Sequence, residues 1–225
     1  MHWTHLKGKV THSLFLCIML IAAGTFLSGC TSTKYKAYSG TSGHNALKKG
    51  DFETALVQYQ EALRICEKDN CKRGVVVNLI NMGCAYGGLG EVSEELDNFK
   101  KGLDLAYEIN YEEQILYAVL NIAITSADIG DFKTAAEYLE KLDIEKLPKK
   151  IRRSFLRIRG AICINQGKYE EGLKYEIESL KMCDSKTNMD NFHKVSAMKN
   201  IAGAFLKKGD YRKACQYAND SLTLL

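Results

Sequence analysis

The sequence predicts an all-α protein, a right-handed superhelical solenoid of about five antiparallel helix pairs. Two observations carry this prediction. The only proline is Pro148, and no stretch alternates β-branched with polar residues as a half-buried strand would. Glycine followed by a polar residue recurs with spacings of 40, 40, 37 and 42 residues, at Gly50, Gly90, Gly130, Gly167 and Gly209. Helix pairs repeated at this interval cannot bury their own apolar faces, so neighbouring pairs are expected to stack.

The flanking residues keep a fixed register to each turn glycine. Seven positions before it stand Gly43, Gly83, Ala123, Gly160 and Ala202. Two positions after it stand Phe52, Val92, Phe132, Tyr169 and Tyr211. Five positions after it stand Ala55, Glu95, Ala135, Gly172 and Ala214. Antiparallel helices approach closely where both present small side chains, and glycine supplies the left-handed residue that ends the first helix.

This register places ten helices in five units. The expected helices span 37–49, 52–68, 71–89, 92–109, 111–129, 132–145, 149–166, 169–184, 190–208 and 211–224. The units are about 37–70, 71–110, 111–148, 149–188 and 189–225.

The repeat resembles the tetratricopeptide repeat (TPR) family over about residues 37–225. The second unit carries the motif well, as Asn81-Met82-Gly83-Cys84-Ala85-Tyr86 followed by Leu89-Gly90-Glu91. A repeat of about 40 residues is similar to the long-helix subclass seen in kinesin light chains and related peptide receptors. The chain departs from the pattern at Glu95, has its closing proline only as Pro148, and shows no polar capping helix before Leu225. An uncapped end would leave an apolar face that could pair with a second copy.

The first 29 residues have the design of a secretory signal peptide. Lys7 and Lys9 precede the apolar run from Leu14 to Leu27, which is shorter than the ~20 residues a permanent membrane helix needs. The segment Leu27-Ser28-Gly29-Cys30 resembles a bacterial lipobox. That resemblance implies lipidation at Cys30, a tether over 30–36, and a protein anchored to the bacterial cell envelope. Thr31 in place of an aspartate implies the outer membrane, facing the periplasm.

Composition argues against several classes of function. The mature chain would hold 29 basic and 27 acidic side chains, so a nucleic-acid partner is not expected. Its two histidines, His44 and His193, lack metal-ligand spacing, and we expect neither a metal nor a cofactor. No nucleophile or carboxylate pair stands at a strand end or glycine-rich loop, so the sequence predicts a non-enzyme.

Six cysteines follow Cys30. Cys66 and Cys71 flank a short turn and could form a disulfide in an oxidising compartment, or could be small core residues, as the other four are expected to be. The sequence leaves this choice open.

The resemblance implies that the first helix of each pair lines a concave groove. Nine residues before the turn glycine, three units carry an asparagine, at Asn81, Asn121 and Asn200. The family uses such asparagines to hydrogen-bond an extended peptide, although they could also bond only locally.

Residues one helical turn from these asparagines would set specificity. The early groove is expected to be apolar, with Val77, Ile80, Tyr117, Leu120 and Ile124. The later groove is expected to be basic, with Arg157, Lys199 and Lys207. This gradient suits a peptide with an apolar half and an acidic half or free C-terminal carboxylate.

The stretch from Lys149 to Arg159 holds six basic residues and no acid. Helical spacing predicts an exposed basic row of Lys149, Arg153 and Arg157. Such a row needs a negative partner, or acids of the preceding helix such as Glu137, Glu140 or Asp143.

The sequence therefore predicts an envelope-anchored scaffold or adaptor that binds a segment of a partner protein in its groove. Two alternatives remain open. One is a pilotin-like assembly factor for type IV pili or a secretin, and the other is a receptor for a short secreted peptide.

Overall fold

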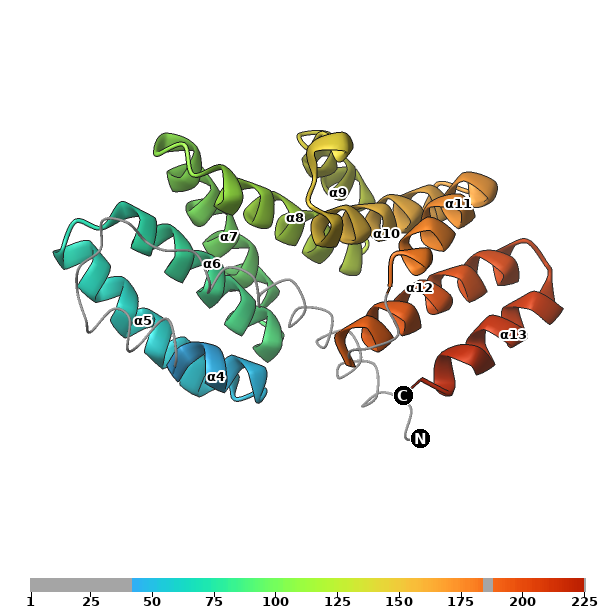
Figure 1. Cartoon of the computed structure of the whole chain (residues 1–225), viewed down its shortest axis with the longest axis horizontal. Coiled ribbons are helices and arrows are strands. Elements are labelled where there is room, and N and C mark those ends of the chain that lie inside the picture. Colours follow the sequence, from blue (N-terminus) through green and yellow to red (C-terminus); the bar gives the residue numbers. More distant parts are fainter. Residues whose placement is uncertain (1–41, 184–187, 225) are drawn as a thin grey trace. The chain divides into compact units, whose positions relative to one another are not determined.

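The computed structural model describes residues 42–183 and 188–224, coloured in Figure 1. The predicted signal peptide, the lipobox with Cys30 and the tether lie outside the described residues. The α-helices in the described part are α4 (Gly43–Lys48), α5 (Phe52–Lys68), α6 (Lys72–Leu89), α7 (Val92–Glu108), α8 (Glu112–Asp128), α9 (Phe132–Leu139), α10 (Lys149–Asn165), α11 (Tyr169–Lys181), α12 (Asn188–Lys207) and α13 (Tyr211–Leu222). A 3₁₀ turn, η4, spans Ile144–Lys146. The described residues contain no strand, and the predicted all-α fold of TPR-like helix pairs is confirmed.

The turn glycines act as predicted. All five have positive φ, between 76° and 87°. In each turn the amide of the residue after the glycine donates to a carbonyl in the last turn of the first helix, as Asp51 N does to Ala46 O at 3.0 Å. That residue then begins the second helix, and Asp51, Asp131 and Asp210 also accept a hydrogen bond from an amide in the first turn of that helix. The Gly-Asp dipeptide therefore ends one helix and starts the next.

Two asparagines form the turns between successive pairs in the first half of the chain. Asn70 and Asn110 both have φ 52°, the left-handed region that asparagine tolerates better than most residues. The amides of Cys71 and Tyr111 close these turns by donating to the carbonyls of Cys66 and Ala106, both at 2.8 Å. Sequence reasoning found the glycine turns but did not assign this role to the asparagines.

The helix expected over 132–145 is shorter than predicted. α9 ends at Leu139, and the chain continues through turns into η4. The amides of Lys141 and Leu142 donate three residues back instead of four, and the carboxylate of Asp143 accepts from Glu145 N at 3.1 Å. Leu147 is extended (ψ 134°), as a residue before proline prefers. Asp143 and Pro148 therefore define a connector where periodicity alone predicted helix.

The chain separates into two compact units, divided within α8 between Ile122 and Ala123. In unit 1, α4 packs on α5, α5 on α6 and α6 on α7. In unit 2, α10 packs against α9, α11 and α12, and α12 packs against α13 (Figure 1). None of the described helices is both long and apolar enough to cross a membrane.

Candidate functional site

A cluster of charged and polar side chains in unit 2 is the candidate site. It consists of Asp128 at the end of α8, Arg157 on α10, Glu176 on α11, and Lys199 and Asn200 on α12, and we call it the Glu176 cluster. Arg157, Lys199 and Asn200 were predicted site residues, whereas Glu176 and Asp128 were not. The cluster joins residues from four helices, most of them far apart in sequence.

Glu176 is a fully buried carboxylic acid. Its Oε1 accepts a hydrogen bond from Asn200 Nδ2 at 2.7 Å, and its Oε2 is buried without a hydrogen-bond partner. Its side chain lies against Gly160 on α10, where an added Cβ would meet Glu176 Cγ at 2.8 Å. The small residue predicted at position 160 therefore admits a carboxyl group into the core.

The burial of Glu176 raises the pKa of its carboxyl group to about 8, because desolvation disfavours the charged form. The nearby Arg157 guanidinium and the hydrogen bond from Asn200 oppose this shift. Glu176 is consequently mostly protonated at neutral pH, and its partnerless Oε2 can carry a hydrogen-bond donor.

Two cations and one further carboxylate complete the cluster. Arg157 is 6% exposed and its Nε is buried without a hydrogen-bond partner, whereas Lys199 is exposed. Asp128 is exposed, and its carboxylate interacts electrostatically with both Arg157 and Lys199. With Glu176 neutral, two positive charges face one negative charge, so the cluster carries a net positive charge.

The three predicted asparagines do not share an exposed face. In unit 1, Asn81 is 5% exposed and Asn121 is 2% exposed, and Asn121 Nδ2 lies 3.8 Å from the sulfur of Cys84. In unit 2, Asn200 is half-buried and its amide donates to Glu176. The asparagine ladder stays a prediction, and a peptide would find the Asn200 amide donor already engaged.

The apolar residues expected on an early groove are core residues instead. All of them are at most 5% exposed, namely Val77, Ile80, Tyr117, Leu120 and Ile124. Burial raises the pKa of Tyr117 to about 12, with a smaller contribution from Glu113. The expectation that these side chains present an apolar binding surface is therefore wrong, because neighbouring helices cover them.

The predicted exposed row of basic residues is also wrong. Lys149 is exposed, but Arg153 and Arg157 are only 8% and 6% exposed. α10 is covered by α9, α11 and α12, and arginine can bury its aliphatic stem against such neighbours. The carboxyl groups that act on Arg157 are those of Asp128 and Glu176.

Cys66 and Cys71 are thiols that are not joined in a disulfide, and both are buried in a core cluster with Ala62, Ile65 and Val75. Gly74 makes room for the two sulfur atoms, since a Cβ there would collide with Cys66 Sγ and meet Cys71 Sγ at 3.2 Å. The core interpretation describes this structure, and oxidation of the pair stays a prediction. Cys84 and Cys163 are also buried, whereas Cys215 is exposed.

Register could have revealed Glu176 from the sequence. Nine residues after the turn glycine, the first three units bury a large apolar or aromatic residue, at Tyr59, Phe99 and Leu139. The fourth unit has Glu176 at this position. A charged residue at a core position of a repeat is a signal of function that comparison of the units can detect.

No metal centre emerges from the residues that the structure describes. None of their histidine, cysteine and acidic side chains forms a group of three or more that could hold an ion.

Helix pairs closed by left-handed glycines, with a polar cluster on the first helices, define a TPR-type protein. Residues 96–224 match the family described as the SusR N-terminal TPR domain, and the chain belongs to that family. A TPR repeat-containing protein of Methanocaldococcus jannaschii is 27% identical over 193 residues. The match covers 85% of this chain, and the chain spans about 30% of the length of that relative.

Solved structures share the fold at low sequence identity. NprR in complex with its cognate peptide NprX is 15% identical with a TM-score of 0.71, over 97% of this chain and 67% of that chain. The apo form of RapI is 16% identical with a TM-score of 0.65, over 88% of this chain and 86% of that chain. MamA from Desulfovibrio magneticus RS-1 is 18% identical with a TM-score of 0.60, over 87% and 97%.

Proposed function

We propose that this protein is a protein-binding adaptor of the bacterial cell envelope that holds an acidic segment of a partner protein at the Glu176 cluster. The observation that carries the proposal is the uncompensated positive charge of Arg157 and Lys199 on the first helices of two neighbouring pairs. A carboxylate in the partner, from an acidic side chain or a C-terminus, would answer this charge. Binding to protein segments is the general use of TPR-type scaffolds.

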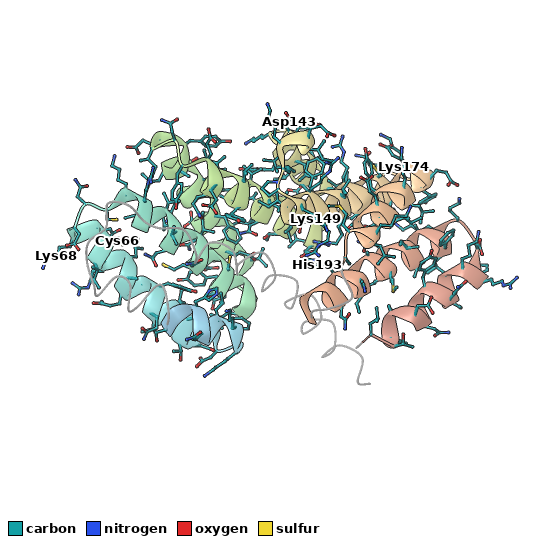
Figure 2. The ribbon with its side chains drawn as sticks, in the orientation of Figure 1. Cys66, Lys68, Asp143, Lys149, Lys174 and His193 are labelled. Carbon is teal, nitrogen blue, oxygen red and sulfur yellow. The ribbon has the colours of Figure 1, made fainter. Side chains whose placement is uncertain are left out.

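Charge reversal at Lys199 tests the site. Lys199→Glu should weaken capture of the partner from an envelope extract by about tenfold, because it replaces attraction with repulsion at the exposed cation. Lys174→Glu is the matched control, since Lys174 is also exposed but lies on α11, outside the cluster (Figure 2). Equal capture by both variants would contradict the proposed site.

A photoreactive residue at position 199 identifies the partner directly. Crosslinks from 199 that are absent from 174 should contain a peptide rich in Asp or Glu, or a C-terminal peptide. Crosslinks of equal yield from both positions would argue against recognition at the cluster.

Anchoring through Cys30 belongs to the same proposal and is tested separately. A cell expressing the full chain should incorporate labelled palmitate into it and retain it with membranes, and Cys30→Ala should abolish both. Fractionation then distinguishes outer-membrane from inner-membrane retention. Retention of Cys30→Ala with membranes would contradict lipid anchoring.

A peptide receptor is the second candidate, favoured by the similarity to NprR, which was solved in complex with its cognate peptide. Under this hypothesis the ligand is a short secreted peptide instead of an envelope protein. Fractionating the extract by size before capture separates the two: large partners support the adaptor, including the pilotin-like version, and a short peptide alone supports the receptor.

A further inference from the structure

We propose that Glu176 is a proton-controlled specificity residue: while protonated it leaves Arg157 and Lys199 available to a carboxylate of the partner, and once ionised it competes for Arg157. This inference rests on the proposed function and adds its regulation. Glu176 is a positioning residue, because its buried carboxyl group acts on the partner through Arg157.

The first step of the argument is the position of the carboxyl group. The hydrogen bond from Asn200 fixes Oε1, and the contact with Gly160 fixes the side chain against α10. Arg157 precedes Gly160 by one helical turn on the same helix and interacts electrostatically with Glu176. Glu176 therefore cannot lose its proton without placing a negative charge beside Arg157.

The second step is the charge that faces Glu176. Among the described residues that act on it, α10 contributes the cation Arg157 and α12 contributes the neutral amide of Asn200. Behind Arg157 stand Lys199 from α12 and Asp128 from the end of α8. The cluster carries one net positive charge when Glu176 is neutral, and that charge is cancelled when Glu176 ionises.

The third step is that the partnerless atoms match this switch. Glu176 Oε2 and Arg157 Nε are both buried without a hydrogen-bond partner. When Glu176 is protonated both are donor groups, so neither can satisfy the other. When Glu176 ionises, Oε2 becomes an acceptor for the guanidinium, and a small rearrangement of either side chain could then pair them. The pKa of about 8 places this change near physiological pH, and burial is its main cause.

The experiment uses the full-length protein and two pooled libraries of random octapeptides that are identical except for the C-terminus, a free carboxylate or a carboxamide. Retention of each pool is measured at pH 7 and pH 9. The unmodified protein should prefer the carboxylate pool at pH 7, and this preference should fall by about tenfold at pH 9, beyond the pKa of Glu176. Glu176→Gln, which keeps an acceptor for Asn200, should hold its preference at both pH values.

Glu178→Gln is the matched control on α11 and should follow the pH profile of the unmodified protein. A ¹³C NMR titration of the Glu176 carboxyl group should show its midpoint near pH 8. Identical pH profiles for Glu176→Gln and the unmodified protein, or a midpoint near pH 4.5, would overturn the inference and leave the proposed function standing. Equal retention of both pools at pH 7 by the unmodified protein and by Lys199→Glu would overturn both.

Discussion

Two helix pairs with the same register, α6–α7 and α10–α11, each bury one carboxyl group, but one helical turn apart. In α6–α7, Phe99 lies on Gly83, and Glu95 lies on Gly87, where an added Cβ would meet its carboxylate at 2.9 Å. In α10–α11, Glu176 lies on Gly160 in the position of Phe99. Each acid is thus matched by a glycine on the facing helix.

The positions opposite these acids exchange size between the two pairs. Glu95, five residues after its turn, faces Gly87, whereas Gly172 at the equivalent position faces Ile164, whose Cγ1 would lie 2.6 Å from an added Cβ. A large side chain on one helix is accommodated by a small one on the other. The repeat therefore conserves the volume between its helices while the residue that fills it changes.

The surroundings of the two acids differ in kind. Glu95 raises the pKa of the buried Cys84 thiol, in addition to the larger effect of burial. Glu176 lies beside a guanidinium and an amide that belongs to the next helix pair. Only the acid in α10–α11 is therefore coupled to exposed charge, which is why we assign function there.

The largest predicted effect is on stability at high pH. The pKa of Glu176 rises from 4.5 when unfolded to about 8 when folded, so unfolding releases a proton between these values. The stability supplied by the neutral acid is complete below pH 4.5 and is lost as pH rises through 8. Between pH 4 and pH 9 the unmodified protein should lose about 3 kcal/mol more than Glu176→Gln, measured by urea unfolding at each pH. Parallel curves for the two proteins would show that Glu176 is not held neutral.

The next effect tests the close crossing of α10 and α11. Gly172→Ala places a Cβ 2.9 Å from the carbonyl oxygen of Gly160, a backbone atom that cannot rotate away. We expect a loss of about 2 kcal/mol in the free energy of unfolding. Gly203→Ala in α12 is the control, since nothing lies within 4 Å of its Cβ, and it should stabilise by about 0.5–1 kcal/mol. Equal effects would show that the crossing is looser than described.

A smaller effect tests the matching of Glu95 to Gly87. Gly87→Ala should cost about 1 kcal/mol, because its Cβ meets the end of a side chain that can shift. In a Glu95→Ala background the same substitution should cost nothing or stabilise, since the collision is gone. Thermal or urea unfolding of the four proteins completes the cycle, and additive changes would refute the exchange of size.

The smallest effect concerns Asp128, which competes with a partner's carboxylate for Arg157 and Lys199. Asp128→Asn should tighten binding of the free-carboxylate peptide pool by about threefold at pH 7. The carboxamide pool should be unaffected. Weaker binding of the carboxylate pool would mean that Asp128 contacts the partner favourably.

The helices and their turns followed from the sequence because local chemistry decides them. Gly50, Gly90, Gly130, Gly167 and Gly209 end helices whatever surrounds them, since a left-handed residue without a Cβ is a local requirement. The connector around Asp143 was missed because the side-chain bond to Glu145 N outcompetes a helical periodicity that continues past it. Three of the five residues of the candidate site were also predicted, as positions on the first helices.

What the sequence alone could not decide was which faces other helices cover. The spacing of Lys149, Arg153 and Arg157 correctly puts them on one face of α10, but that face is buried because three helices pack around α10. The approach of Glu176 to Arg157 and Asn200 joins residues 19 and 24 positions away, and only the packing of α10, α11 and α12 sets it. Backbone turns are short-range and can be read along the chain, whereas burial and the pairing of charges depend on neighbours that the tertiary structure supplies.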